Sequence, residues 1–173
     1  MMRRYTPEDD LAAVHNLLTR AFAYMEGRID PASSLSRLDT EGMKALAAHR
    51  EVWVMEEGNG PVGCMVLTPK DDTLYLGKLA VDYAQRGKGL ARILVDQALR
   101  RAGDLGLDSV TLETRIELTE NHAAFTALGF HKADETAHPG YDRPTSITMV
   151  RPLGTAGRAG GRRAKRAARN REI

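Results

Sequence analysis

The segment from Leu74 to Ala102 constrains the fold most, because it predicts a buried strand, a turn and a long helix in direct succession. Residues 74–81 are rich in leucine and valine, a pattern typical of a strand buried in a sheet. Residues 90–102 repeat apolar side chains at helical spacing and so give one broad apolar face. The strand and the helix are joined by a short glycine-rich turn with a strong positive charge.

This turn predicts an anion-binding site. A helix that begins directly after a strand leaves its first backbone N–H groups unpaired, and its dipole favours negative charge at that end. Glycine lets the backbone come close to a phosphate that a Cβ atom would hold away. The predicted anion site comprises Arg86, Gly87, Lys88, Gly89, Leu90, Ala91 and Arg92.

Two common phosphate-binding motifs do not fit the turn. The Walker motif, G-x-x-x-x-G-K-[ST], is absent from the chain. The dinucleotide motif, G-x-G-x-x-G, fails at its last position, where Arg92 stands in place of glycine.

The order of the predicted elements indicates an α/β (α+β) fold with a mixed sheet and helices on both faces. A helix is expected to begin at Thr6 as N-cap with Pro7 at its first position, and another to be capped by Thr119. The predicted strands are residues 2–5, 52–55, 62–67, 74–81, 109–114, 131–136 and 146–151, and the predicted helices are 7–25, 40–50, 90–102 and 120–128.

Two segments resemble motifs of the GNAT superfamily of N-acetyltransferases. Residues 86–91 (RGKGLA) are similar to the acetyl-CoA motif [Q/R]-x-x-G-x-[G/A], and residues 125–130 (FTALGF) are similar to the segment Y-x-x-L-G-F. The element order over residues 2–152 also resembles that family. The resemblance implies a mostly antiparallel sheet of six to seven strands whose central pair splays apart.

The resemblance further implies an acetyl-CoA site and direct acetyl transfer to a primary amine of a small molecule or protein. The pantetheine arm would pair with the backbone of Leu79, Ala80 and Val81, and the pyrophosphate would lie on residues 86–91. Arg92, Asn121 and Phe125 complete the expected cofactor contacts.

The catalytic groups are less well defined by the sequence. A lysine-like amine has a pKa of ~10.4, so a base should assist its deprotonation at neutral pH. Glu113 is the first candidate for this base and Glu117 the second, while Tyr75 stands in the strand where some relatives carry a glutamate. The family usually protonates the departing thiolate with the tyrosine of Y-x-x-L-G-F, which here is Phe125. Asn121, one helical turn earlier, is the nearest polar substitute, unless the thiolate leaves unaided.

Phe125 leaves an alternative open, in which the domain is a catalytically degenerate sensor that binds acyl-CoA. Acceptor specificity is expected from two loops, residues 27–34 and 136–145, because loops vary while the cofactor slot is shared. No histidine spacing suggests a metal site.

Charge and composition indicate the extent of the domain, the nature of the C-terminal tail and the cellular setting. Residues 1–153 form the expected domain, with a net charge of about −4, whereas residues 154–173 carry about +6 and form a basic, disordered tail. Nucleic-acid binding by this tail is the less favoured reading, because the tail has no aromatic residue. The single cysteine, Cys64, lies in an apolar run, which fits a buried thiol and a cytoplasmic protein. No apolar run predicts a membrane segment, and the resemblance leaves room for a homodimer.

Overall fold

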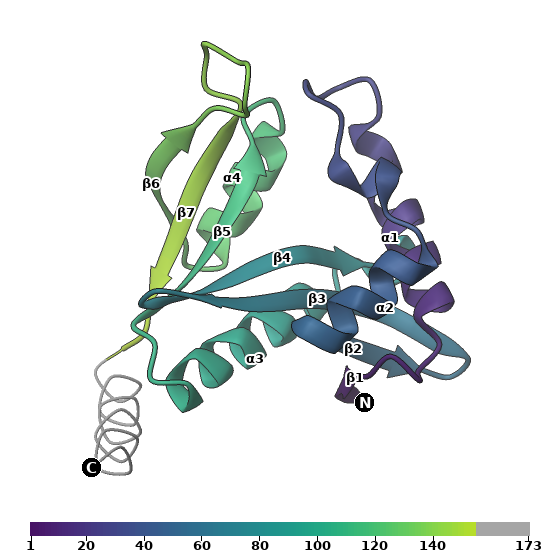
Figure 1. The fold of residues 1–173 in the computed structure, drawn as a ribbon. Helices are drawn as coiled ribbons and strands as arrows, with labels where there is room; N and C mark the ends of the chain where they lie inside the picture. The colour runs from purple at the N-terminus through teal and green to yellow at the C-terminus, as the bar shows by residue number, and fades with distance from the viewer. Residues whose placement is uncertain (155–173) are drawn as a thin grey trace.

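The computed structural model describes residues 1–154, so the expected basic tail lies outside the described residues apart from Gly154. Figure 1 shows one twisted sheet with helices against both of its faces. The elements are β1 (Met2–Tyr5), α1 (Leu11–Phe22), η1 (Ala23–Met25), η2 (Ser34–Arg37), α2 (Thr40–His49), β2 (Glu51–Glu57), β3 (Gly60–Lys70), β4 (Thr73–Val81), η3 (Tyr83–Gln85), α3 (Leu90–Asp104), β5 (Ser109–Arg115), α4 (Thr119–Ala127), β6 (His131–Thr136) and β7 (Ser146–Pro152), where η denotes a short 3-10 helix.

The sheet has seven strands in the order β1-β2-β3-β4-β5-β7-β6. Neighbouring strands are antiparallel except β4 and β5, which run parallel. The long α3 helix makes the crossover between β4 and β5 that a parallel pair requires. The predicted mixed and mostly antiparallel sheet is therefore confirmed.

The parallel pair is the weak point of the sheet. Residues 73–75 of β4 pair with residues 109–111 of β5, and the remaining six residues of β4 have no partner in β5. Beyond Tyr75 the two strands diverge, as Figure 1 shows, so that one sheet becomes two half-sheets joined at one end. The predicted splay of the central pair is present.

Two apolar cores fill the two faces of the sheet. On one face, α3 packs its buried side chains, such as Leu94 and Ala98, against Leu76 of β4 and Leu112 of β5. On the other face, α1 and α2 cover β2 and β3. Alternate residues of each strand point to opposite faces, which explains why one strand contributes to both cores.

Cys64 on β3 is 1% exposed, as expected for a small buried apolar residue. Burial raises the pKa of its thiol to about 12, so at neutral pH it is a thiol rather than a nucleophilic thiolate.

Two predicted helix starts are wrong. Helix α1 begins at Leu11, and Asp10 is its N-cap, accepting a hydrogen bond from the backbone N–H of Ala13 at 3.1 Å. Residues 6–9 instead form a turn, in which the N–H of Asp9 donates to the carbonyl oxygen of Thr6 at 3.1 Å and the N–H of Thr6 donates to Asp9 Oδ2 at 2.7 Å. Helix α4 has Leu118 as its N-cap, without a side-chain hydrogen bond, and Thr119 is already helical.

Glu51 ties the β1–β2 end of the sheet to α3. Its carboxylate, whose side chain is 10% exposed, accepts hydrogen bonds from the guanidinium of Arg101 on α3 at 2.8–3.0 Å and from the indole of Trp53 at 3.0 Å. Burial opposes ionisation of Glu51, but these hydrogen bonds outweigh it and hold the pKa of the carboxyl below its ordinary value.

We expect Glu51→Gln to lower the free energy of unfolding by about 1–3 kcal/mol at neutral pH, because Arg101 loses a buried charged partner. A carboxyl whose folded pKa is depressed contributes stability above its unfolded pKa of ~4.3, and that contribution disappears as the pH falls. The difference between parent and variant should therefore shrink in acid. Urea unfolding at pH 7 and pH 3.5 measures both effects, with exposed Glu57→Gln as the control. An equal loss of unfolding free energy at the two pH values would contradict this account.

Candidate active site

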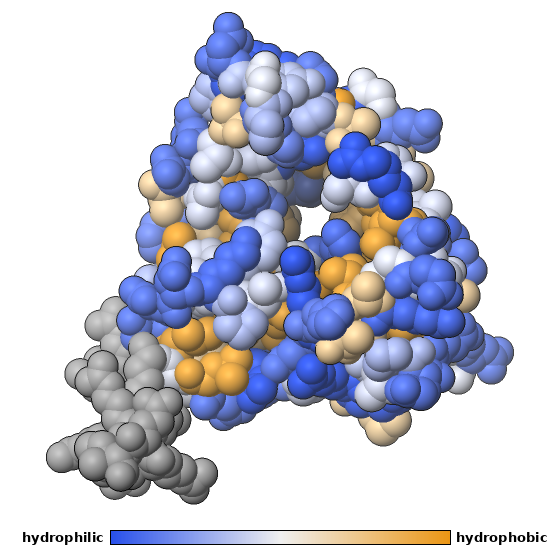
Figure 2. Space-filling model, in the orientation of Figure 1, coloured by the Kyte–Doolittle hydropathy of each residue, from blue (hydrophilic) through white to orange (hydrophobic). Residues whose placement is uncertain are grey.

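A cavity of about 340 Å³ lies where β4 and β5 diverge. Its walls come from residues 75–79 of β4, residues 112–115 of β5, the end of α1 with η1, residues 33–35, and α4. Figure 2 shows the molecule hollowed between the part that contains β5–β7 and α4 and the part that contains α1 and α2. The cavity exists because the sheet opens there, rather than because any one loop folds around it.

Side-chain contacts across the splay bridge the open end of the cavity. Arg28 pairs with Glu120 of α4 at 2.6 Å. Asp30 accepts a hydrogen bond from the hydroxyl of Tyr141 at 2.6 Å and pairs with Arg143 at 3.0 Å. The loops 27–34 and 136–145, each expected to face the acceptor, therefore meet at Asp30, although more than 100 residues separate them in sequence.

The glycine-rich turn at the start of α3 has an open backbone. Gly87 has a φ of +79° and Gly89 a φ of +82°, values that L-residues rarely adopt, and a Cβ atom on either glycine would meet no other atom within 4 Å. Gly89 is the N-cap of α3, and no side chain caps the helix. The turn thus presents the unpaired N–H groups of a 15-residue helix to open space.

The three cations of the turn are exposed, and each has a local contact. Arg86 donates to the carbonyl oxygen of Ala21 at 3.4 Å, and Lys88 donates to the side chain of Gln85 at 2.8 Å. Arg92 donates to the carbonyl oxygen of Ala127 at 3.3 Å, which links α3 to the end of α4. Contacts of this kind are weak enough in solvent for an anion to compete with them.

The backbone of β4 between the cavity and the turn is paired on one side. Ala80 and Val81 pair with residues 64 and 63 of β3, while β5 has already diverged from the opposite edge. Lys78, just before them, has a φ of +50°, and the register with β3 shifts at this point. Such a left-handed lysine is strained and marks the bend with which β4 leaves the regular sheet.

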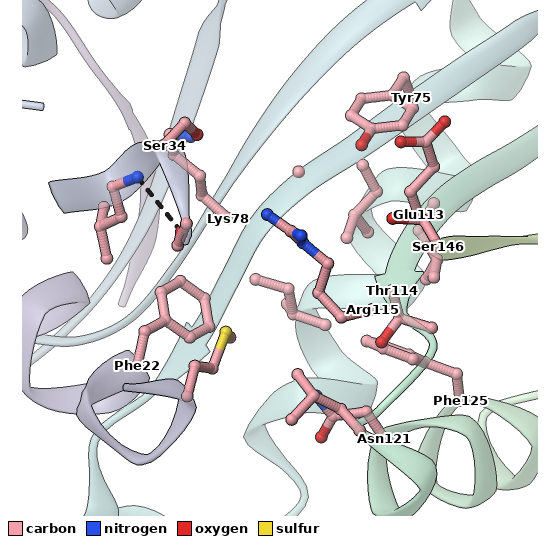
Figure 3. A pocket seen from close by; sticks show the side chains of 18 of the residues that line it. Phe22, Ser34, Tyr75, Lys78, Glu113, Thr114, Arg115, Asn121, Phe125 and Ser146 are labelled. Atoms are coloured by element: carbon pink, nitrogen blue, oxygen red, sulfur yellow. Dashed lines mark hydrogen bonds between the residues drawn. The ribbon is translucent and has the colours of Figure 1, made fainter. Parts of the chain in front are cut away.

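Glu113 and Tyr75 face each other across the narrow end of the splay, on β5 and β4 respectively, as Figure 3 shows. Burial, reinforced by the negative charge of Glu113, raises the pKa of Tyr75 to about 12, so the phenol is neutral. Glu117, the second candidate base, does not line the cavity. The geometry thus favours Glu113.

Asn121 and a residue that the sequence analysis missed meet inside the cavity. The side-chain amide of Asn121 donates a hydrogen bond to the hydroxyl of Tyr24 at 2.9 Å, and both side chains line the wall. Tyr24 lies in η1, 97 residues earlier in the chain. No local sequence pattern marks Tyr24 as a site residue, because a tyrosine also suits the end of an amphipathic helix.

The profile of the Acetyltransferase (GNAT) family matches residues 11–130, more than two thirds of the chain. The chain belongs to the GNAT family. Curated relatives include rat N-acetyltransferase 8F1, 34% identical over 96 residues that make up 52% of this chain and 43% of the relative, and human N-acetyltransferase 8B, 33% identical over 90 residues that make up 49% and 40%. This chain therefore spans less than half the length of these relatives.

Solved GNAT structures share the fold at low sequence identity. The ribosomal-protein-S18-alanine N-acetyltransferase of Escherichia coli superposes with a TM-score of 0.65 at 19% identity, covering 90% of this chain and 96% of that one. A GNAT acetyltransferase from Elizabethkingia anophelis, solved with acetyl-CoA bound, gives a TM-score of 0.64 at 17% identity over 88% and 97%.

Neither a metal centre nor a membrane-spanning helix is found in residues 1–154. No three His, Cys, Asp or Glu side chains of this part of the chain gather in a metal-binding group. None of its helices is both long enough and apolar enough to span a bilayer.

Phe125, at the position where GNAT enzymes usually carry a tyrosine, has two roles in the packing. Its ring lies edge-on to the buried ring of Phe130, with centroids 6.1 Å apart and an interplanar angle of 72°. The same ring is only partly buried and lines the cavity. Phe125 is therefore neither a purely core residue nor a purely cavity residue.

We expect Phe125→Tyr to leave the free energy of unfolding within about 1 kcal/mol of the parent, because a hydroxyl at the cavity wall can reach water. Phe130→Tyr is the matched control. Its ring is 2% exposed, so the same hydroxyl would be buried without a partner and cost about 1–3 kcal/mol. Chemical denaturation of both variants measures the difference. An equal loss in the two would mean that the Phe125 ring is as buried as that of Phe130.

Proposed function

We propose that this chain is an acetyl-CoA-dependent N-acetyltransferase that moves an acetyl group directly from coenzyme A to a primary amine. The observation that carries the proposal is the continuity of three features along one strand. β4 contributes the cavity wall at residues 75–79, then an unpaired edge at residues 79–81, and then leads into the open glycine turn.

Acetyl-CoA fits these features in one orientation. Its pyrophosphate suits the N–H groups of residues 87–92 and the cations around them, since a helix N-terminus favours anions. Its pantetheine arm, which carries amides, suits the free edge of Leu79, Ala80 and Val81. The thioester then reaches the cavity, where Asn121 and Phe125 form part of the wall.

Two groups in the cavity have the chemistry for the transfer. Glu113 serves as the base that takes the proton of the incoming ammonium, directly or through a water, so that the nitrogen lone pair can attack the thioester carbonyl. As the C–N bond forms and the C–S bond breaks, the hydroxyl of Tyr24 donates its proton or a hydrogen bond to the departing sulfur. The hydrogen bond from Asn121 occupies a lone pair of Tyr24 and leaves its O–H proton available.

This arrangement argues against the alternative of a non-catalytic acyl-CoA sensor. That alternative rested on the missing tyrosine at position 125, and Tyr24 supplies a phenol from the other side of the cavity. A cytoplasmic location is part of the proposal and is supported by the single cysteine, which is a buried thiol.

Gly89→Val should abolish coenzyme A binding and turnover, because a branched side chain would occupy the space in front of the α3 N-terminus. Gly58→Val in the β2–β3 turn is the matched control, since Gly58 also has a positive φ, of +57°, and nothing within 4 Å of an added Cβ. Both variants carry the same kind of backbone strain, so a similar small loss of stability is expected. Calorimetry with coenzyme A and thiol release from acetyl-CoA over a panel of amines measure the outcome. Undiminished coenzyme A affinity in Gly89→Val would refute this cofactor site.

Tyr24→Phe should lower kcat by about 10²-fold, the low end of the range for acid–base groups, because a thiolate leaves more readily than most leaving groups. The KM for acetyl-CoA should change little. Tyr83→Phe, which alters a tyrosine that is 82% exposed, should behave like the parent. Steady-state kinetics of the purified variants distinguishes the two. A Tyr24→Phe enzyme with unchanged kcat would mean that the sulfur leaves without help from this phenol.

A further inference from the structure

The cavity holds two basic side chains without a carboxylate partner among residues 1–154. Lys78 of β4 and Arg115 of β5 both line it. Figure 3 shows Arg115 extended across the cavity, with Tyr75 and Glu113 on one side of it and Lys78 on the other. Basic residues at the rim behave differently, because Arg28 pairs with Glu120 and Arg143 pairs with Asp30.

Arg115 is held in place but incompletely satisfied. Its Nη2 donates to the carbonyl oxygen of Ala32 at 3.3 Å, which ties the guanidinium to the loop of residues 27–34. Its Nη1 is buried and has no hydrogen-bond partner in the described part of the chain. Buried polar atoms are almost always paired, and an unpaired charged donor is costly, so this nitrogen indicates an absent acceptor.

The ammonium of Lys78 likewise lacks a negatively charged partner among residues 1–154. Burial, followed by the nearby positive charge of Arg50, lowers the pKa of its ammonium, and no carboxylate of residues 1–154 offsets these effects. An anion in the cavity would relieve both Lys78 and Arg115. Two carboxylates of the chain lie near in sequence, but within residues 1–154 neither forms an ion pair with these cations. Glu113 lines the cavity, whereas Glu117 does not line it and has a buried Oε2 without a hydrogen-bond partner.

The phosphates of acetyl-CoA do not account for this charge. The glycine turn proposed to hold them, residues 86–91, lies outside the lining of the cavity. Arg115 instead shares one face of β5 with Glu113, since residues two apart on a strand point the same way, about 7 Å apart along it. The proposed base and the unpaired cation are thus neighbours on the side that faces the loops 27–34 and 136–145.

We propose that the acceptor is a small molecule that carries a carboxylate close to its amine, as an α-amino acid does, with Arg115 and Lys78 holding the carboxylate while Glu113 receives the proton of the amine. This proposal rests on the function proposed above. Arginine suits the task because its planar guanidinium binds a carboxylate through two parallel hydrogen bonds. The same two cations disfavour polyamines, and a peptide N-terminus offers only a neutral amide where the carboxylate would be.

The test compares the 20 common L-amino acids with their α-carboxamides, and with putrescine, as acceptors in thiol release from acetyl-CoA by the full chain. We expect the best acceptor to be an amino acid whose kcat/KM exceeds that of its own amide by about 30-fold or more, the range for a hydrogen bond to a buried charge. The amides have the less basic amine and are intrinsically easier to deprotonate at neutral pH, so a preference for the acid must come from the protein. An amide or putrescine that matches the best acid would overturn the proposal while leaving the acetyltransferase function intact.

Arg115→Gln identifies the residue responsible. We expect its acid-to-amide ratio to fall to below about 3, through a higher KM for the acid with the amide unaffected. Arg100→Gln on the exposed face of α3, where Arg100 hydrogen-bonds to Gln97, is the control and should keep the parental ratio. If Arg115→Gln lowered kcat/KM equally for the acid and the amide, the role of Arg115 would be structural and the assignment would be refuted. Lys78→Met, which keeps most of the length of the side chain and removes its charge, should also lower the acid-to-amide ratio, and it provides a second test should Arg115→Gln fold poorly.

A binding measurement separates this proposal from the failure of the proposed function. In the presence of saturating coenzyme A, a screen of the 20 amino acids and their α-carboxamides should find an amino acid that raises the melting temperature of the parent, whereas its amide should not, and the shift should vanish in Arg115→Gln. If no amine is acetylated but the shift is seen, the carboxylate site stands and the catalytic function fails. If neither acid nor amide changes the melting temperature, the carboxylate site fails.

Discussion

The parting of β4 from β5 is the feature on which the rest of the molecule depends. Parallel strands need a long crossover, and α3 provides it, so that the end of β4 and the start of α3 lie at the same edge of the sheet. After only three paired residues on each strand the ladder stops, and each strand keeps one unpaired edge. Unpaired backbone groups inside a protein require partners. The fold thus leaves a slot with a free strand edge, where we propose that the pantetheine arm binds, and the glycine turn lies beyond it.

The splay also has to be held open at a defined width. Within residues 1–154 the two halves of the sheet are joined at one end by the short parallel ladder and at the other by side chains that reach across the opening. Asp30 contacts Tyr141 and Arg143, and Arg28 contacts Glu120. These pairs are exposed and individually weak, so each contributes little to stability. Their position, rather than their energy, makes them relevant, because they shape the entrance through which an acceptor must pass.

The inner surface of the cavity combines groups from distant parts of the chain. The base candidate Glu113 and the cation Arg115 come from β5, Lys78 comes from the strained bend of β4, and Tyr24 comes from η1, directly after α1. Position 125 on α4 holds phenylalanine where the motif Y-x-x-L-G-F has tyrosine, so this position supplies no proton donor. The hydrogen bond between Asn121 and Tyr24 indicates how a phenol can reach the same space from the opposite wall.

The sequence by itself determined the order of elements, the mixed sheet and the nature of the glycine turn, because these follow from local periodicity and from what glycine permits. Apolar alternation and helical spacing located the seven strands and four α-helices of residues 1–154, with errors at the starts of α1 and α4. At α1 the reason is a turn of residues 6–9, closed by the hydrogen bond from the N–H of Asp9 to the carbonyl of Thr6, which composition does not reveal. At α4 the cap lies one residue earlier, at Leu118, and no side-chain hydrogen bond marks it. The tertiary structure alone decided which side chains share the cavity. Tyr24 and Asn121 are 97 residues apart, and Arg115 and Ala32 are 83 apart. Contacts at such separations depend on how the half-sheets diverge and how loops return across them, and no pattern in a single sequence encodes that geometry.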